Sequence, residues 1–140
     1  MRTVRTDEII AYAKDLKKQW GNNPINIARR FGINVLINDS NEIKAQTIKL
    51  DNYPTIISIY GCKDPIGQRV LCAHELGHAL LHNDFVNKYS GSYKTLINET
   101  EYEANLFAVA LLFDDKDFYI PISRMSNYLL KAVLDYNIRK

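Results

Sequence analysis

Residues 74–82 read His-Glu-Leu-Gly-His-Ala-Leu-Leu-His and contain all three histidines of the chain. The apolar residues in and around this stretch recur every three or four positions, which predicts a helix. Because residues four apart lie on one helix face, His74 and His78 can reach a single metal ion. Glu75 can act as general base beside that ion. The pattern therefore predicts a hydrolytic metal centre on a helix.

The third histidine continues the same row, four residues after His78. His74 and His82 are eight residues apart, about 12 Å along a regular helix, whereas zinc–nitrogen bonds are about 2 Å long. His74 and His82 therefore cannot bind one ion together. We expect His82 to support the site from outside, to line its edge or to cap the end of the helix.

Hydrolytic zinc sites take three protein ligands and keep one position open. The candidates for the third ligand are the acids and the thiol nearest in sequence, namely Cys62, Asp84, Glu99, Glu101 and Glu103.

The helix expected over residues 97–113 favours Glu101. At about 100° per residue, Glu101 shares one narrow stripe with small and apolar residues and one amide: Ala104, Asn105, Ala108 and Leu112. The two alanines would let this helix approach the histidine helix closely. Glu99 and Glu103 fall on the opposite side, where we expect them to point to water.

Asn105 lies one turn beyond Glu101 on that stripe. It can hydrogen-bond an imidazole that binds the metal and so fix its tautomer. The alternatives are an Asn105 that bonds a loop and a Glu101 that is a solvated surface acid.

The remaining pattern predicts an α+β fold. Three short β-rich segments separated by turn residues suggest a small antiparallel sheet, at 33–37, 43–50 and 55–60. Helices are expected on either side of the sheet in sequence, at 6–20, 24–31, 66–82, 97–113 and 123–136. Asn23 and Pro24 read as the cap and first turn of the second helix, and Gly32 as its left-handed end.

In this chain the H-E-x-x-H stretch at residues 74–82 is followed at 101–108 by Glu-Tyr-Glu-Ala-Asn-Leu-Phe-Ala. Together the two stretches resemble the ImmA/IrrE family of metallo-endopeptidases. The resemblance covers roughly residues 1–115 and is strongest over 70–112. Where the family often has Leu-Leu-Met-Pro, this chain has Leu-Leu-Phe-Asp at 111–114, so the end of that helix is expected to differ.

The resemblance implies a zincin-like fold, with the sheet packed on the H-E-x-x-H helix and on a following ligand-bearing helix. It implies Zn²⁺ held by His74, His78 and Glu101, with Glu75 as base. Better-known members cleave helix-turn-helix repressors, so we expect an endopeptidase with a regulatory protein as substrate. Manganese or iron are alternative metals for these ligands.

Two details of such a reaction are open at this stage. The segment Thr55–Tyr60 immediately precedes the histidine helix and, as an exposed edge strand, could pair with an extended substrate. The donor that stabilises the oxyanion is not chosen among four tyrosines, Tyr60, Tyr89, Tyr93 and Tyr102.

Composition narrows the other classes. The chain has 140 residues, 46% hydrophobic and 24% charged, and its net charge is 18 − 16 = +2. These values suit one domain over 1–140 and are too mild to indicate nucleic acid. Of the two cysteines, Cys72 is expected in the core and Cys62 in a loop. No stretch reaches the roughly 20 apolar residues of a membrane helix, and we expect a cytoplasmic protein that does not bind a membrane.

Two rival functions stay open. Residues 27–33 resemble half of a helix-turn-helix, but a strand is expected where a recognition helix would follow, so we do not expect direct nucleic-acid binding. The other rival is a zincin-like protein that binds a repressor without cutting it. The presence of Glu75 speaks against that reading.

Overall fold

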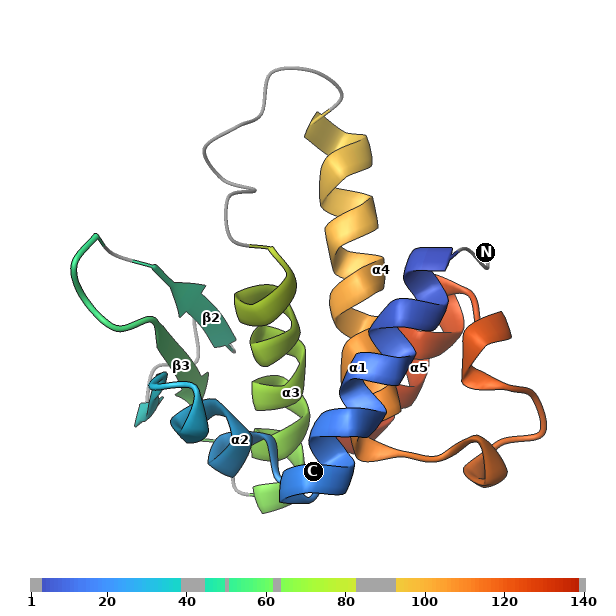
Figure 1. Ribbon diagram of the computed structural model, residues 1–140, viewed down its shortest axis with the longest axis horizontal. Helices are drawn as coiled ribbons and strands as arrows, with labels where there is room; N and C mark the ends of the chain where they lie inside the picture. Colours follow the sequence, from blue (N-terminus) through green and yellow to red (C-terminus); the bar gives the residue numbers. More distant parts are fainter. Residues whose placement is uncertain (1–3, 39–44, 50, 62–63, 83–92, 139–140) are drawn as a thin grey trace.

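The computed structural model describes residues 4–38, 45–49, 51–61, 64–82 and 93–138. Within these residues the chain forms five α-helices and one three-stranded sheet. Figure 1 shows the sheet on one side, α3 (Pro65–Leu81) in the middle and the remaining long helices on the other side. The α+β class predicted from the sequence is confirmed.

The first two helices follow the predicted signals closely. Helix α1 (Val4–Trp20) ends at Gly21, whose φ of 83° is readily adopted by glycine. The side chain of Asn23 accepts a hydrogen bond of 3.1 Å from the Ile25 amide and so caps α2 (Pro24–Arg30). A strand follows α2 directly, so residues 27–33 are not part of a helix-turn-helix.

The sheet has the order β1-β3-β2, with β1 at Asn34–Asn38, β2 at Ala45–Ile48 and β3 at Ile56–Tyr60. Strand β3 pairs antiparallel with β2 and parallel with β1. The prediction of an antiparallel sheet is therefore wrong for the β1–β3 pair. The chain reverses once before β2 and again before β3, so β3 regains the direction of β1 and lies beside it.

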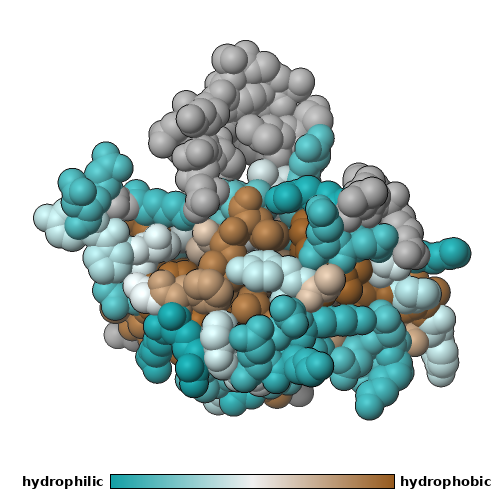
Figure 2. All heavy atoms as spheres, in the orientation of Figure 1, coloured by the Kyte–Doolittle hydropathy of each residue, from teal (hydrophilic) through white to brown (hydrophobic). Residues whose placement is uncertain are grey.

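Strand β3 occupies the centre because it is the most apolar of the three. Ile57 and Ile59 are fully buried in the core, whereas both outer strands carry exposed residues. The predicted role of this segment as an exposed edge for a substrate is wrong, since β3 is paired along both sides. Figure 2 shows hydrophobic residues gathered across the middle of one face of the molecule, between hydrophilic margins.

Helices α3 and α4 (Tyr93–Leu112) cross at close range. A Cβ atom built on Gly77 would lie 3.1 Å from the Cα of Ala104 and 3.3 Å from a ring carbon of Phe107. Gly77, which lies between His74 and His78 in sequence, is therefore in contact with the backbone of α4. The close approach expected from the small residues of α4 occurs, with Ala104 at the contact.

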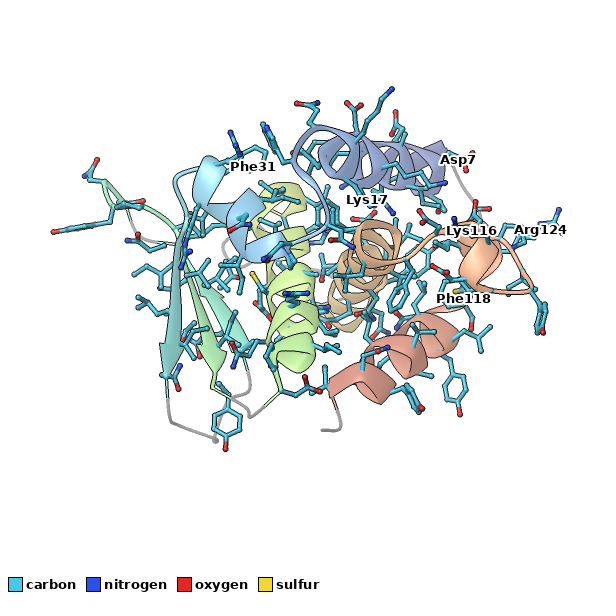
Figure 3. The ribbon with its side chains drawn as sticks, turned by 90° about the horizontal axis from the view of Figure 1, so that it is seen from below. Asp7, Lys17, Phe31, Lys116, Phe118 and Arg124 are labelled. Atoms are coloured by element: carbon cyan, nitrogen blue, oxygen red, sulfur yellow. The ribbon has the colours of Figure 1, made fainter. Side chains whose placement is uncertain are left out.

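Helix α4 lies at the centre of the helical layer. Every residue from Ala104 to Leu111 is buried, as expected of a helix that is covered on all sides. Helix α1 packs along one flank of α4. The Lys17 Nζ donates to the carbonyl oxygens of Ala110 and Phe113, at 3.1 and 2.9 Å, and pairs with Asp114. Figure 3 shows Lys17 between α1 and α4. A lysine thus satisfies the last carbonyls of α4, where the chain departs from the Leu-Leu-Met-Pro pattern.

The predicted helix bounds differ from the observed ones mainly late in the chain. Helix α4 begins four residues before 97. The helix expected over 123–136 is divided into a 3₁₀ turn at Ile122–Arg124 and α5 (Asn127–Ile138). In the part of the chain that the structure describes, no helix combines the length and the apolar character needed to cross a membrane.

Candidate metal centre

His74, His78 and Glu101 meet at the crossing of α3 and α4. The Nε2 atom of His74 lies 3.2 Å from Oε1 of Glu101, and Nε2 of His78 lies 2.8 Å from Oε2 of the same carboxylate. The ligand atoms of all three residues lie within 4.8 Å of one another. Two segments separated by more than 20 residues therefore bring two imidazoles and one carboxylate to one point.

These three side chains fit a metal ion such as zinc. Donor atoms in a tetrahedral zinc site are about 3.4 Å apart, since each lies about 2.1 Å from the ion. The distances from Glu101 to the two histidines are close to that value. The Glu101 side chain is 44% exposed, so the site opens to solvent. A fourth coordination position of a bound metal could therefore be reached from solvent.

The electrostatics of the site favour a charged carboxylate. Hydrogen bonds from His74 and His78 hold the pKa of Glu101 well below its usual range. Burial alone would lower the pKa of His74, but the hydrogen bond and the negative charge of Glu101 outweigh it, and the pKa of His74 is raised. Metal binding at this point would replace these hydrogen bonds by coordination to the same atoms.

Asn105 contacts the first of the two histidines. It makes a side-chain hydrogen bond with His74 that also raises the pKa of this imidazole. Because this bond favours the protonated imidazole, the Asn105 side-chain oxygen accepts from His74, while its Nδ2 donates to Oδ1 of Asn127 at 2.8 Å. Asn105 is buried between α3, α4 and the start of α5. Its action beside a bound metal stays a prediction.

His82 contacts the second histidine. It ends α3 as the C-cap, and its Nδ1 lies 3.1 Å from Nδ1 of His78. On its other side, His82 Nε2 lies 2.9 Å from Oε1 of Glu103. Arg5 of α1 donates to Glu103 at 2.7 Å through Nε and at 3.2 Å through Nη2. A chain of contacts thus runs from His78 to α1.

The positions of the protons in this series of contacts follow if His78 binds a metal through Nε2. Its Nδ1 must then carry the proton and donate to His82 Nδ1. His82 Nε2 carries the remaining proton and donates to the Glu103 carboxylate. Burial alone would raise the pKa of Glu103, but hydrogen bonds from His82 and Arg5 lower it, which keeps it an acceptor. Every link then has one donor and one acceptor.

Glu103 was expected to point to water, and that prediction is wrong. The side chain is only 17% exposed. That prediction assumed that α4 packs against the histidine helix alone. In the structure α4 lies between α3 and α1, so its second flank is covered as well. His82 also leaves the regular helical row at the cap, with φ −127° and ψ 70°, and can reach round to Glu103. Glu99 is exposed, as expected.

Glu75 is buried and held by a residue of the sheet. The hydroxyl of Thr47 on β2 lies 2.7 Å from Oε1 of Glu75 and 3.1 Å from its backbone carbonyl oxygen. The charge of Glu75 contributes to the raised pKa of His74, so its carboxylate lies near the metal group. The arrangement places a fixed proton acceptor beside a candidate metal position.

The other candidates either lie outside the described residues or are directed elsewhere. Cys62, Asp84 and Tyr89 lie outside the described residues, as does the side chain of Tyr93. The hydroxyl of Tyr102 lies 3.2 Å from that of Thr6 in the core, on the α1 side of α4, and is thereby directed away from the histidines. Cys72 is fully buried, in agreement with the core position expected for it.

Three residues were not expected from the sequence to support the site: Thr47, Glu103 and Arg5. Thr47 shares one face of its strand with Ala45, and this alternation of faces could have placed Thr47 against a helix. Glu103 lies two residues after Glu101, and its inward position depends on the second packing partner of α4. For Arg5 the sequence carries no signal, since it contacts Glu103 from 98 residues away.

Comparisons with known proteins agree with this geometry. Residues 28–136 match the family model Peptidase_M78, described as IrrE N-terminal-like domain. A relative in Bacillus phage phi105, named "Uncharacterized immunity region protein 2", is 33% identical over 102 residues, which is 71% of this chain and 64% of the relative. The chain thus corresponds to less than two thirds of that relative's length. No solved structure matches the chain. Because the family model spans most of the sequence, including both helices of the site, the chain belongs to the Peptidase_M78 family, the group with IrrE N-terminal-like domains.

Proposed function

We propose that the chain is a zinc-dependent endopeptidase that cleaves a regulatory protein. His74, His78 and Glu101 are the metal ligands in this proposal, and Glu75 is the general base. One observation carries it: the three donor atoms converge within 4.8 Å on the helix crossing, beside a buried carboxylate. The match to a peptidase family supports the same chemistry.

The donor set suits zinc, because two histidines and one carboxylate leave a fourth position open. Zinc supplies Lewis acidity and makes a water molecule acidic enough to lose a proton near neutral pH. Glu75 takes that proton and later delivers it to the leaving amine. Thr47 holds the Glu75 carboxylate in place while this happens. Asn105 and His82 keep the two imidazoles in the tautomers that binding through Nε2 requires.

The proposed substrate is a helix-turn-helix repressor. Two points support a regulatory substrate. The better-known members of the family that the chain resembles cleave helix-turn-helix repressors, and the phage relative is named as an immunity region protein. A repressor acts on DNA inside the cell, so the proposed place of action is the cytoplasm.

The proposal is tested with purified wild type and Glu75→Gln, each incubated with zinc and with any helix-turn-helix repressor encoded beside the gene. Wild type should release two fragments, and a chelator should abolish them. Glu75→Gln should bind zinc as wild type does and release none, because the isosteric amide cannot accept the proton. Glu99→Gln, an exposed acid on α4, is the matched control and should cleave normally.

Mass spectrometry of the fragments gives the cleaved bond, and elemental analysis gives the metal. Cleavage by Glu75→Gln at the wild-type rate would contradict the proposed base. A repressor that is bound but left intact by every variant would favour the alternative of a non-catalytic binding protein.

A further inference from the structure

A cavity of about 230 Å³ lies directly beside the cluster of His74, His78 and Glu101. His74, Glu101 and Asn105 line one part of it, and the rest lies between α3 and α5. Figure 3 shows α5 alongside α4, with its C-terminal end directed toward α3. None of the residues assigned to the metal or to proton transfer accounts for the α5 side of this cavity.

Away from His74, Glu101 and Asn105, the inner lining of the cavity is apolar. Val70 and Leu71 come from the turn of α3 before His74, and Leu134 and Ile138 come from one face of α5. Val70, Leu71 and Leu134 are each no more than 8% exposed, so they form a fixed wall that belongs to the core. An apolar group placed against this wall is removed from water on several sides, which favours its binding.

The charges at the cavity cancel one another. Lys131 and Asp135 line it one helical turn apart on α5, and their side chains pair at 2.8 Å. Both are more than half exposed, so they face the solvent side rather than the apolar wall. The cavity therefore offers neither an unpaired cation for an acidic group nor an unpaired anion for a basic one.

The volume fits one side chain rather than a whole small molecule. Pockets for drug-sized ligands usually enclose roughly 300–1,000 Å³, and this cavity is smaller. Its position beside two of the proposed metal ligands would place such a side chain next to the bond that is cut.

We propose that this cavity is the specificity pocket of the enzyme and takes one uncharged apolar side chain of the substrate adjacent to the cleaved bond. The inference rests on the proposed function, because the pocket gains this meaning only if His74, His78 and Glu101 hold a metal.

Hydroxamates test the pocket separately from cleavage. Acetohydroxamate presents a metal-binding group without a side chain, 4-methylpentanohydroxamate adds a branched apolar chain, and 6-aminohexanohydroxamate adds a cationic one. Dissociation constants for the full zinc-loaded chain are measured by isothermal titration calorimetry. The branched probe should bind about tenfold or more tightly than acetohydroxamate, and the cationic probe should show no such gain.

Variants of Ile138 then locate the gain. Ile138 is only partly buried at the end of α5, so it can be changed with little disturbance of the core. Ile138→Trp should fill the cavity and abolish the gain for the branched probe, while acetohydroxamate binds as before. Ile138→Ala should enlarge the cavity and move the preference to the bulkier 3-phenylpropanohydroxamate. Leu129→Trp, on an exposed part of the same helix, is the matched control and should keep the wild-type order.

The outcomes separate the two proposals. If none of the probes binds the zinc-loaded chain, the metal site fails and the proposed function fails with it. If acetohydroxamate binds but the branched probe binds no better, the metal site stands and the pocket is overturned. A gain that survives in Ile138→Trp, or an unchanged preference in Ile138→Ala, also overturns the pocket.

Discussion

The Nδ1 atom of His82 lies 3.1 Å from the Nδ1 atom of His78, so the third histidine of the chain contacts the second rather than the proposed metal position. The other nitrogen of His82 contacts Glu103, which is paired with Arg5. The orientation of one proposed ligand thus depends on a residue of α1.

We predict that His82→Ala weakens zinc binding by roughly 10- to 100-fold, the range seen when the residue behind a metal-binding histidine is lost. The His78 Nδ1–H would lose its acceptor. Glu103→Gln should weaken binding by a smaller factor, because the amide oxygen can still accept but the charge is gone. Zinc affinity is measured by competition with a chromophoric chelator.

Glu99→Gln is the control for the loss of one negative charge on α4. It should bind zinc as wild type does. Equal zinc affinity in His82→Ala and wild type would show that the contact between the two histidines does not support the ligand.

Thr47→Val should reduce kcat by about tenfold while KM and zinc affinity stay unchanged. The hydroxyl contacts Glu75 but none of the proposed ligands in the described structure, and a mobile base transfers protons less effectively. Thr47→Ser retains the hydroxyl and should restore most of the rate. The measurement is steady-state kinetics on the substrate cleaved by wild type, and a parallel loss of zinc in Thr47→Val would instead indicate a structural role.

Gly77→Ala should destabilise the fold by about 1–3 kcal/mol. The added methyl group would lie 3.1–3.3 Å from Ala104 and Phe107, which is too close for the helices to stay in place. Because the proposed ligands are divided between these helices, zinc affinity should fall together with stability. Urea unfolding and zinc titration check the two effects, with the exposed Arg69→Ala on the same helix as control.

Because of Cys72, the free energy of unfolding should fall as the pH rises through the alkaline range. Burial raises the pKa of its thiol from 9.0 to about 12, with a smaller contribution from the charge of Glu75. Between these values the folded chain keeps the thiol neutral, whereas the unfolded chain ionises it and is stabilised. Folding stability from this group is thus complete below pH 9 and falls by about 1.4 kcal/mol per pH unit above it.

The comparison with Cys72→Ala isolates this effect, because all other titrating groups are shared. Between pH 8.5 and 10.5, wild type should lose about 2 kcal/mol more of its free energy of unfolding than the variant. Parallel losses in urea unfolding at the two pH values would contradict the prediction.

Local patterns allowed most of the helices and the convergence of His74, His78 and Glu101 to be predicted. The spacing in one helix and the face of another depend only on helical geometry and the sequence. What depended on how elements pack against one another was predicted less well. The central position of β3 results from competition among three strands, and the burial of Glu103 results from the packing of α1 on α4.

The contact between Arg5 and Glu103 has a practical meaning for work with shortened chains. The family model begins at residue 28, beyond the end of α1. A version trimmed to that boundary would lose the guanidinium that pairs with Glu103 and the lysine that caps α4, and it would uncover the buried flank of α4. The region that matches the family model is therefore smaller than the smallest piece expected to fold and keep His74, His78 and Glu101 together.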